Sequence, residues 1–212
     1  MQRLNVNAEV DRYIQSHPSI KDCLKKGIIN YSKLSRLISN EIGMKKTASF
    51  DAILISCRRH QQRLKTERGY EKKIMSVMQE TTIETMSHVL VATIEKDVFF
   101  DHLVLLQKRI RDRKEMFQFI EGVKAITVIT RMEFSKDIEK IFRTKVLSLK
   151  TGLALITLRS PLNVEETPGF VGYIYSLLGE NGINILETMS CWTDTLFVVN
   201  DSDMEKAIRL MK

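Results

Sequence analysis

The sequence predicts an α+β protein in which an N-terminal helical bundle is followed by two βαββαβ units. Three observations support this fold class. Apolar residues recur at helical spacing through the first 66 residues, and from His88 the period becomes that of strands. The order of strand and helix patterns then occurs twice, with equivalent elements about 64 residues apart. The expected domains are a helical domain at 1–66, a connecting helix and short strand at 67–87, a first unit at 88–150 and a second at 151–212.

The composition is that of an ordinary globular protein, and it excludes several classes. The three cysteines, Cys23, Cys57 and Cys191, are scattered and odd in number, which indicates neither a disulfide framework nor a CxxC metal site. No apolar run approaches the roughly 20 residues of a membrane helix, and residues 1–10 are too polar for a signal peptide. We therefore expect a cytoplasmic protein with no membrane partner.

Positive charge is concentrated in the first part of the chain. Residues 1–80 contain 16 Lys and Arg against 8 Asp and Glu, a net charge of +8, whereas the remaining 132 residues have a net charge of −1. This asymmetry favours a polyanionic partner such as a nucleic acid. The alternative is a solvated surface that happens to be rich in lysine.

The helical domain is predicted to contain four helices. His17 precedes a proline and therefore ends the first helix, while Gly27 and Gly43 end the second and third. The expected inner positions are Val10, Tyr13, Ile14, Ile20, Cys23, Leu24, Leu34, Leu37, Ile38, Ile42, Phe50, Ile53, Leu54, Cys57 and Leu64.

Residues 33–59, KLSRLISNEIGMKKTASFDAILISCRR, resemble a helix-turn-helix of the winged-helix kind. The resemblance implies that the second helix enters the major groove of double-stranded DNA, and that nearby cations contact phosphates. The intervening turn is longer than the tight form, and Arg58, Arg59 and His60 come late on the helix, where backbone contact is favoured over base reading. A protein-docking face is the alternative. The candidate DNA-binding residues are Lys45, Lys46, Thr47, Ser49, Arg58, Arg59, Gln62 and Arg63.

The segment that follows has two interpretations. Tyr70, Ile74, Val77 and Met78 form an amphipathic pattern, which predicts either a connecting or dimerising helix or a further core helix of the N-terminal domain. Residues 81–86 alternate in polarity and predict a short strand, which we interpret as a wing of the helix-turn-helix unit.

Each later unit has the order of the split ferredoxin-like arrangement. In the first unit we expect strands at 89–94, 117–120, 125–130 and 146–149, a helix through Leu103, Leu106 and Ile110, and a helix from Ser135. In the second we expect strands at 153–158, 182–190 and 195–199 and helices from Pro168 and at 201–211. No last strand is evident in the second unit, so either a neighbouring unit completes its sheet or the edge stays open.

Residues 167–185, TPGFVGYIYSLLGENGINI, are the most informative stretch. Pro168 suits the first turn of a helix, and Val171, Ile174, Leu177 and Leu178 form one apolar stripe. Glycines then allow a sharp exit into a strand. Free amides at the start of such a helix can hold an anion, for example an amino-acid carboxylate.

Residues 153–211 resemble the ACT domain, in the form found in the regulatory part of aspartokinases. The matching motifs are TPGF at 167–170, ENGINI at 180–185 and VVNDSDMEKAIRLM at 198–211. The resemblance implies tandem units that pair through their sheets, as a homodimer or larger assembly, and bind a small amino acid at the interface. The first unit has Lys96, Asp97 and Val98 in place of the Pro-Gly turn, so the resemblance carries no ligand site over to it.

The resemblance also implies which residues hold the effector. The carboxylate would accept hydrogen bonds from the N–H groups of residues 169–171, the ammonium would lie near Asn184, and Ile185 would wall the site. A pairing surface without a ligand is the alternative. The candidate ligand-binding residues are Asn163, Thr167, Pro168, Gly169, Phe170, Val171, Asn184 and Ile185.

No catalytic constellation is evident. The sequence contains no GxGxxG, GxxxxGK[ST], HExxH or GxSxG motif, and His17, His60, His88 and His102 are isolated from one another. We therefore expect no enzyme, no cofactor and no metal site. The leading hypothesis is a DNA-binding transcriptional regulator that senses an amino acid. The alternative is a regulatory subunit without DNA binding that gives feedback control of a biosynthetic enzyme; an RNA-associated protein is a weaker third, since no aromatic stacking platform accompanies the basic residues.

Overall fold

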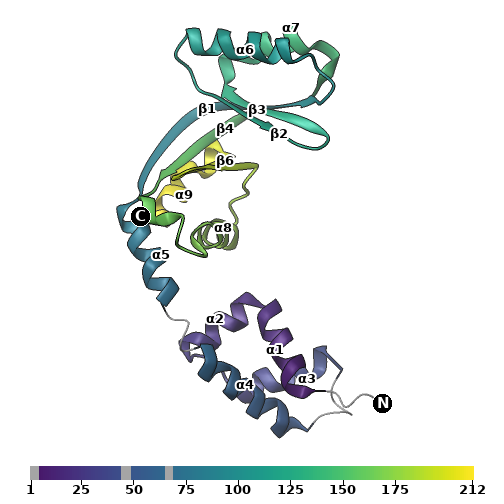
Figure 1. The fold of residues 1–212 in the computed structure, drawn as a ribbon, viewed down its shortest axis with the longest axis vertical. Coiled ribbons are helices and arrows are strands. Elements are labelled where there is room, and N and C mark those ends of the chain that lie inside the picture. Colours follow the sequence, from purple (N-terminus) through teal and green to yellow (C-terminus); the bar gives the residue numbers. More distant parts are fainter. Residues whose placement is uncertain (1–4, 44–48, 65–68) are drawn as a thin grey trace. The chain divides into compact units, whose positions relative to one another are not determined.

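The computed structural model describes residues 5–43, 49–64 and 69–212. The chain divides into two compact units, Met1–Lys73 and Ile74–Lys212, and each is described by itself. Figure 1 shows the helices of the first unit and the sheet with its covering helices in the second.

The first unit contains the four predicted helices, and local sequence signals set their ends. They are α1 (Val6–Ser16), α2 (Pro18–Lys26), α3 (Tyr31–Glu41) and α4 (Phe50–Leu64). The side chains of Asn5 and Asn30 accept hydrogen bonds from the backbone N–H groups of the first turns of α1 and α3, as N-caps do. Gly27 ends α2 in the left-handed conformation, with φ of 73°.

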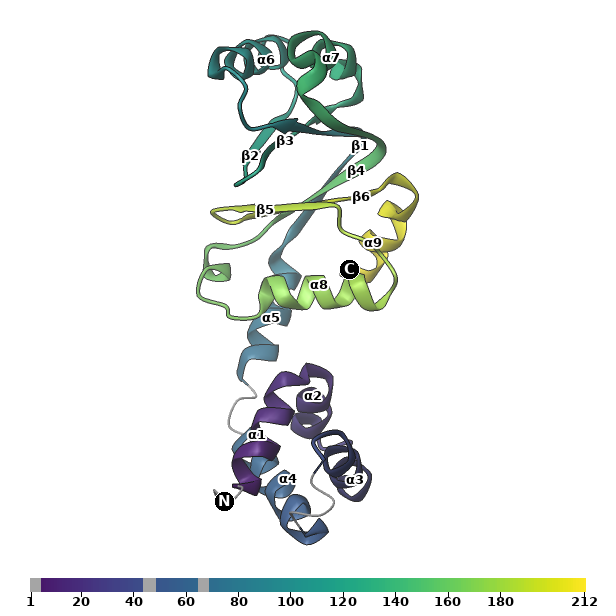
Figure 2. The ribbon, with the colours of Figure 1, turned by 90° about the vertical axis from the view of Figure 1, so that its right-hand side faces the viewer.

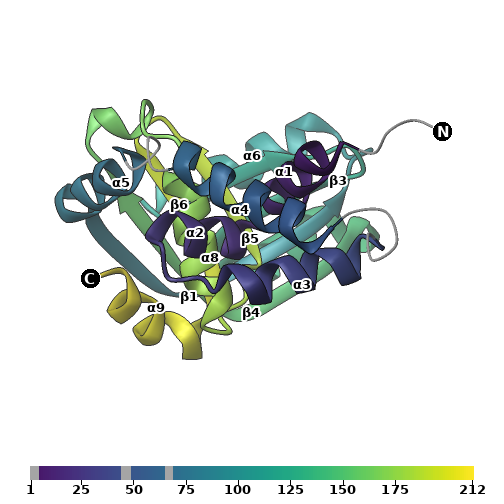
Figure 3. The same cartoon turned by 90° about the horizontal axis from the view of Figure 1, so that it is seen from below.

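Helix α4 is the centre of this unit, because it packs against both α1 and α3 (Figure 3). Two predicted inner positions are wrong. Leu37 and Phe50 are 42% and 40% exposed, because Leu34 and Ile38 already fill the space under α3 and the guanidinium of Arg36 lies over the Phe50 ring at 5.8 Å. The buried core consists of Val10, Tyr13, Ile14, Leu24, Leu34, Ile38, Ile53, Cys57 and Leu64.

The amphipathic helix after the bundle is α5 (Gly69–Glu80). Its apolar residues Ile74 and Val77 are buried against Phe170 of the second unit's own core. The hydrophobic stripe of α5 therefore stabilises the second unit. Of the two interpretations of this segment, a connecting helix fits this packing, and a further core helix of the N-terminal domain does not.

The second unit contains one six-stranded antiparallel sheet with the strand order β2-β3-β1-β4-β6-β5. The strands are β1 (Thr82–Glu95), β2 (Phe117–Glu121), β3 (Ala125–Arg131), β4 (Val146–Arg159), β5 (Glu187–Cys191) and β6 (Asp194–Asn200). The order contains two overlapping sets of four, β2-β3-β1-β4 and β1-β4-β6-β5. Each set is the strand arrangement of one βαββαβ unit.

The two βαββαβ units of the sheet share their longest strands, β1 and β4. β1 and β4 each have 14 residues, and Thr82–Met86 pairs with residues 155–159, beyond the part of β1 that pairs with β3. Residues 82–86 are therefore the last strand of the second βαββαβ unit rather than a wing, which corrects the expectation for this segment. Of the two alternatives for the sheet of the second βαββαβ unit, completion by the neighbouring unit is the one observed, since β1 pairs with β4. The border expected at residue 150 falls inside β4.

The sheet curls where the two halves meet. The pairing of β1 with β4 shifts register between Met86 and Val91, and His88 and Gly152 there have φ of 57° and 71°. As a result, the faces without helices pack against each other (Figure 2). This central layer is formed by Val89, Val91, Ile129, Leu153, Leu155, Leu196 and Val198.

Helices cover the two outer faces. α6 (Phe100–Asp112) and α7 (Ser135–Phe142) pack on one half, where Leu90, Ala92 and Ile94 point toward them from β1. α8 (Phe170–Glu180) and α9 (Met204–Met211) cover the other half. Successive side chains of a strand point to opposite faces, so alternate residues pack into the central layer and into the outer layers.

Replacing Ile83 with aspartate tests whether residues 82–86 belong to the second unit. Ile83 packs against the core beneath α8 and α9, so a carboxylate there loses water without gaining a partner. We expect Ile83→Asp to lower the free energy of unfolding by about 2–3 kcal/mol. Urea titration followed by the fluorescence of Trp192, the only tryptophan, measures it.

The matched control is Thr85→Asp, which places the same charge on an exposed position of the same strand. It should change stability by less than about 0.5 kcal/mol. Equal effects of the two substitutions would contradict the strand pairing described above.

Candidate functional site

The turn predicted to bind a ligand lies at the start of α8. A short 3-10 helix, η5 (Leu162–Val164), precedes it, and α8 begins at Phe170, two residues later than expected from Pro168. The first cap position is Gly169, with φ of +89°. Only glycine adopts this conformation without strain, so the glycine fixes the direction in which the helix starts.

The first amides of α8 are free donors. No side chain caps the helix, and the first bonds are from the N–H of Phe170 to the Thr167 carbonyl (3.4 Å) and from the N–H of Tyr173 to the Gly169 carbonyl (2.8 Å). Among the described residues, the N–H groups of Val171 and Gly172 have no acceptor. Together with the partial positive charge of a helix N-terminus, these two donors can hold a carboxylate.

Thr167 and Asn163 shape the turn. Thr167 is buried, and its hydroxyl donates to the backbone carbonyl of Asn163 at 2.7 Å. The Thr167 hydroxyl is thus used to hold the loop closed. In this arrangement Thr167 and Asn163 stabilise the loop through their mutual hydrogen bond.

One side of the turn is closed by α5. Phe170 is buried against Ile74 and Val77, and a Cβ built on Gly169 would lie 3.4 Å from Cδ1 of Ile74. Phe170 therefore packs inward, while Pro168 and Gly169 remain exposed. The free amides of Val171 and Gly172 stand between this packed side and the solvent.

Asn184 and Ile185 lie at the other end of α8. The helix has 11 residues, which at 1.5 Å per residue corresponds to about 16 Å. Asn184 is exposed and Ile185 is half-buried in the core under α8. One copy of the chain therefore does not bring Asn184 to the amides at Val171. Strand β5, which begins at Glu187 rather than Gly182, is the end strand of the sheet and leaves one edge unpaired beside this region.

The predicted DNA-binding residues divide into two groups. Lys45, Lys46 and Thr47 lie outside the described residues. Ser49 is the cap of α4, because its hydroxyl oxygen accepts from the N–H of Ala52 at 3.2 Å. The outer positions that follow are Asp51 and Ile55, an acid and an apolar residue that is 46% exposed. The start of α4 is consequently poor in base-reading groups.

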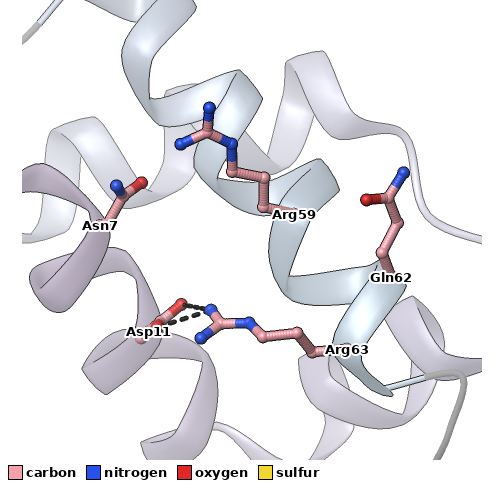
Figure 4. A pocket seen from close by; sticks show the side chains of 5 residues that line it. All are labelled: Asn7, Asp11, Arg59, Gln62 and Arg63. Carbon is pink, nitrogen blue, oxygen red and sulfur yellow. Dashed lines mark hydrogen bonds and ion pairs between the residues drawn. The ribbon is translucent and has the colours of Figure 1, made fainter.

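The second group lies on the last two turns of α4. Arg58 is exposed, with its guanidinium 5.9 Å from the centre of the Tyr31 ring. Arg59, Gln62 and Arg63 line a hollow of about 640 Å³ together with Asn7 and Asp11 of α1 (Figure 4). Arg63 donates from Nη2 to both carboxylate oxygens of Asp11 at 2.6 Å. The hollow thus contains one carboxylate that is already bound to an arginine.

Asp11 also binds His60, a residue that the sequence did not pair with anything. His60 is buried, its Nδ1 lies 2.7 Å from Oδ1 of Asp11, and its Nε2 is buried with no partner among the described residues. Burial tends to raise the pKa of Asp11, but the hydrogen bonds from Arg63 and His60 outweigh this and hold the pKa below its usual value. The pair is 49 residues apart in sequence, and no local pattern reveals it.

The described residues contain no group of three or more His, Cys, Asp or Glu side chains arranged to hold a metal ion. Within the same ranges, no helix is both long and apolar enough to cross a lipid bilayer.

Comparison with known proteins identifies the fold of the sheet unit. No family model and no curated protein matches the sequence. The structure is similar to aspartate kinase from Clostridium acetobutylicum, with a TM-score of 0.51 and 18% identity over 61% of this chain and 33% of that one. It is also similar to the ligand-free regulatory subunit of aspartate kinase from Thermus thermophilus, with a TM-score of 0.49 and 12% identity over 61% of this chain and 92% of that subunit.

The match spans about a third of the whole kinase chain. At 18% identity this likeness shows a shared fold alone. The helix-turn-helix character of the first unit stays a prediction.

Two glycines of α8 provide a test of the helix entrance. Gly169→Ala places a side chain at φ of +89° against Ile74, so we expect a loss of about 1–2 kcal/mol in the free energy of unfolding. Gly179→Ala, inside the same helix with open space around its Cα, should instead gain about 0.5–1 kcal/mol. Urea titration of both variants measures the difference. Equal signs would mean that Gly169 does not have the conformation described.

The ion pair of Asp11 predicts a pH dependence. The pKa of Asp11 is lowered by folding, so its contribution to stability is present above the usual carboxyl pKa and is lost as the pH falls through the lowered value. Asp11→Asn should therefore cost about 1 kcal/mol at pH ~7 and nearly nothing below pH ~3. Urea titrations followed by helical circular dichroism at both pH values measure this. The control is Asp51→Asn, which changes an exposed acid on α4. If Asp11→Asn lowers the free energy of unfolding as much at low pH as at neutral pH, packing rather than charge causes the loss.

Proposed function

We propose that this protein is an amino-acid-sensing regulatory protein without catalytic activity, and that its effector binds at the start of α8. The observation that carries the proposal is the pair of free N–H groups at Val171 and Gly172, presented by the left-handed Gly169. The ACT-type fold of the unit supports it. A free carboxylate is the part of an amino acid that such donors recognise.

The site is completed by a second copy of the chain. The carboxylate would bind the amides at Val171, while the ammonium needs an oxygen acceptor, for which Asn184 is the candidate. These two parts lie about 16 Å apart along α8 within one copy. Two copies related by a twofold axis, with α8 and β5 side by side and antiparallel, would bring Asn184 of one copy to Gly169 of the other. A homodimer through the β5 edge follows from this requirement.

Helix α5 is the element that would couple effector binding at the start of α8 to the first unit. Ile74 lies against Gly169, and α5 begins at Gly69, so its first residues belong to the first unit and the rest to the second. An effector that favours one position of the α8 entrance would favour one position of Ile74. A coupling of about 1–3 kcal/mol between the two sites suffices for a regulatory response.

The first unit would bind the partner that the effector controls, and we propose double-stranded DNA as this partner. Arg58 and Arg59 are exposed, and the +8 charge of residues 1–80 attracts phosphates. Because Asp51 and Ile55 occupy the outer face of the first turns of α4, phosphate contact is favoured over reading of bases. The exposed Phe50 and Ile55 support the second candidate, docking on a biosynthetic enzyme under amino-acid control.

An amino-acid screen tests the sensor. We expect one or a few of the twenty amino acids to raise the melting temperature of the full chain, since a ligand at 100 times its Kd stabilises the folded form by about 2.7 kcal/mol. Asn184→Ala should reduce this shift without changing the melting temperature of the protein measured without an added amino acid. Asn200→Ala, also an exposed asparagine, should leave the shift intact. A flat response to all twenty at millimolar concentration would overturn the proposal.

Binding of duplex DNA at several salt concentrations tests the output. Arg58→Ala/Arg59→Ala should weaken binding about tenfold and reduce the slope of log K against log[salt] by about 1.8, the value for two lost phosphate contacts. The control Lys72→Ala/Lys73→Ala removes the same charge from exposed positions of α5. Identical losses in both variants would indicate general attraction only, and an absence of salt-dependent binding would leave the enzyme-docking candidate.

A further inference from the structure

A second cavity lies in the first half of the sheet unit, away from the α8 entrance. It has a volume of about 530 Å³, within the usual range for small-molecule sites. Its walls are the loop between β1 and α6 (residues 97–99), the side of α6 that carries His102 and Arg109, and the end of α7 with the turn that follows (residues 140–145). We call it the α6–α7 pocket.

Four cations line this pocket, and two of them are already neutralised. Arg109 donates to Asp137 at 2.7 Å, and Lys145 donates to Glu95 at 2.6 Å and Asp97 at 2.8 Å. The hydrogen bonds that Lys145 donates to Asp97 and Glu95 raise the pKa of Lys145 to about 12, so this amine is charged at neutral pH. The Arg109–Asp137 pair is neutral, whereas Lys145 with its two carboxylates, Glu95 and Asp97, has a net charge of −1. These contacts hold the paired side chains in place.

The free positive charge comes from the other two cations. Lys140 and Arg143 are exposed to the pocket and have no hydrogen-bond or ion-pair partner among the described residues. Lys140 lies in the last turn of α7 and Arg143 directly follows the helix, and both line the same pocket. With the −1 of the Lys145 group, these two cations leave the pocket with a net charge of +1, and each can donate to a different phosphate oxygen.

The helix ends nearby do not change this balance. The N-terminus of α6 has no side-chain cap and contributes partial positive charge, while the C-terminus of α7 contributes partial negative charge of similar size. These effects oppose each other. The two free side chains therefore decide which charge the pocket attracts.

An aromatic ring stands beside the cations. Phe99 is 76% exposed, although an apolar ring of this size normally packs into a core. Its neighbour His102 meets it edge to face, with ring centres 5.8 Å apart and planes at 83°, and His102 also contacts Phe142 in the same way. This geometry fixes the ring of Phe99 at one side of the pocket and leaves most of its surface uncovered. A planar base can stack on such a ring.

The backbone of Arg143 is strained at this place. Its φ is 49° with ψ of −119°, a combination that residues other than glycine rarely adopt. Strained backbone conformations cluster at active sites and ligand sites, where the strain is part of the function. Glycine would suit this backbone better, so the arginine is not explained by the stability of the turn.

We propose that the α6–α7 pocket binds a nucleoside diphosphate, with its phosphates on Lys140 and Arg143 and its base against Phe99. The site is separate from the amino-acid site at α8 and would give the protein a second ligand of a different chemical class. It does not depend on the function proposed above.

Binding of ADP carrying a fluorescent N-methylanthraniloyl group, measured by anisotropy on the full chain, tests the proposal. Arg143→Gly should weaken binding about tenfold, the effect of one lost charge-assisted hydrogen bond. Its melting temperature should not fall, because glycine relieves the backbone strain. Lys140→Ala should weaken binding to a similar extent. The control is Lys114→Gly, which removes a cation at φ of 60° outside the pocket and should leave binding unchanged.

Three results would overturn the proposal. The first is the absence of saturable binding, and the second is an equal loss in Lys114→Gly and Arg143→Gly, which would mean general attraction to a basic protein. The third concerns the base: competition by pyrophosphate as strong as that by unlabelled ADP, or unchanged affinity in Phe99→Ala, would exclude a nucleotide as the ligand. Loss of binding in the pocket variants with an intact response to amino acids would confirm that the two sites are independent.

Discussion

The pairing of residues 82–86 with residues 155–159 is the constraint on which the rest of the sheet unit depends. It makes β1 and β4 members of both βαββαβ units, so neither unit has a complete sheet without the other. It also forces the curl that brings the two helix-free faces together as one buried layer. Because α5 ends at Glu80, immediately before β1, the same pairing holds α5 against α8, and the hydroxyl of Thr81 donates to that of Ser160 at 3.1 Å to fasten this junction.

The two halves share a fold and differ in the chemistry at their helix entrances. In the second half, the α8 entrance offers backbone donors, because Gly169 exposes amides that no side chain caps. In the first half, the α6 entrance has no glycine, and charge is supplied instead by side chains of α7 and the turn after it. Backbone donors in a fixed turn suit one small carboxylate, whereas flexible cations suit a larger anion with several charges. The ligands proposed for the two halves therefore differ, although the two halves share one fold.

The helical unit combines an apolar core with a polar contact between α1 and α4. Most of its core is aliphatic, but Asp11 is held by both His60 and Arg63 across α1 and α4. This contact fixes the end of α4 on which Arg59 and Gln62 stand. It also places a carboxylate in the hollow beside them, which reduces the net positive charge of this face. The charge of residues 1–80 is consequently less concentrated on α4 than their composition suggests.

The sequence by itself determined the features that depend on neighbours along the chain. Asparagine caps, the proline at 18 and the glycines at 27 and 169 set where helices start and stop, and apolar periodicity identified the order of helices and strands, because these signals act within a few residues. The sequence also located the turn at Gly169, although not the start of α8 at Phe170. Only the tertiary structure decided that residues 82–86 pair with residues 155–159, that Ile74 closes one side of the Gly169 turn, and that His60 contacts Asp11. These contacts join distant segments whose local patterns fit other partners equally well, so only the packing of the whole chain selects among them.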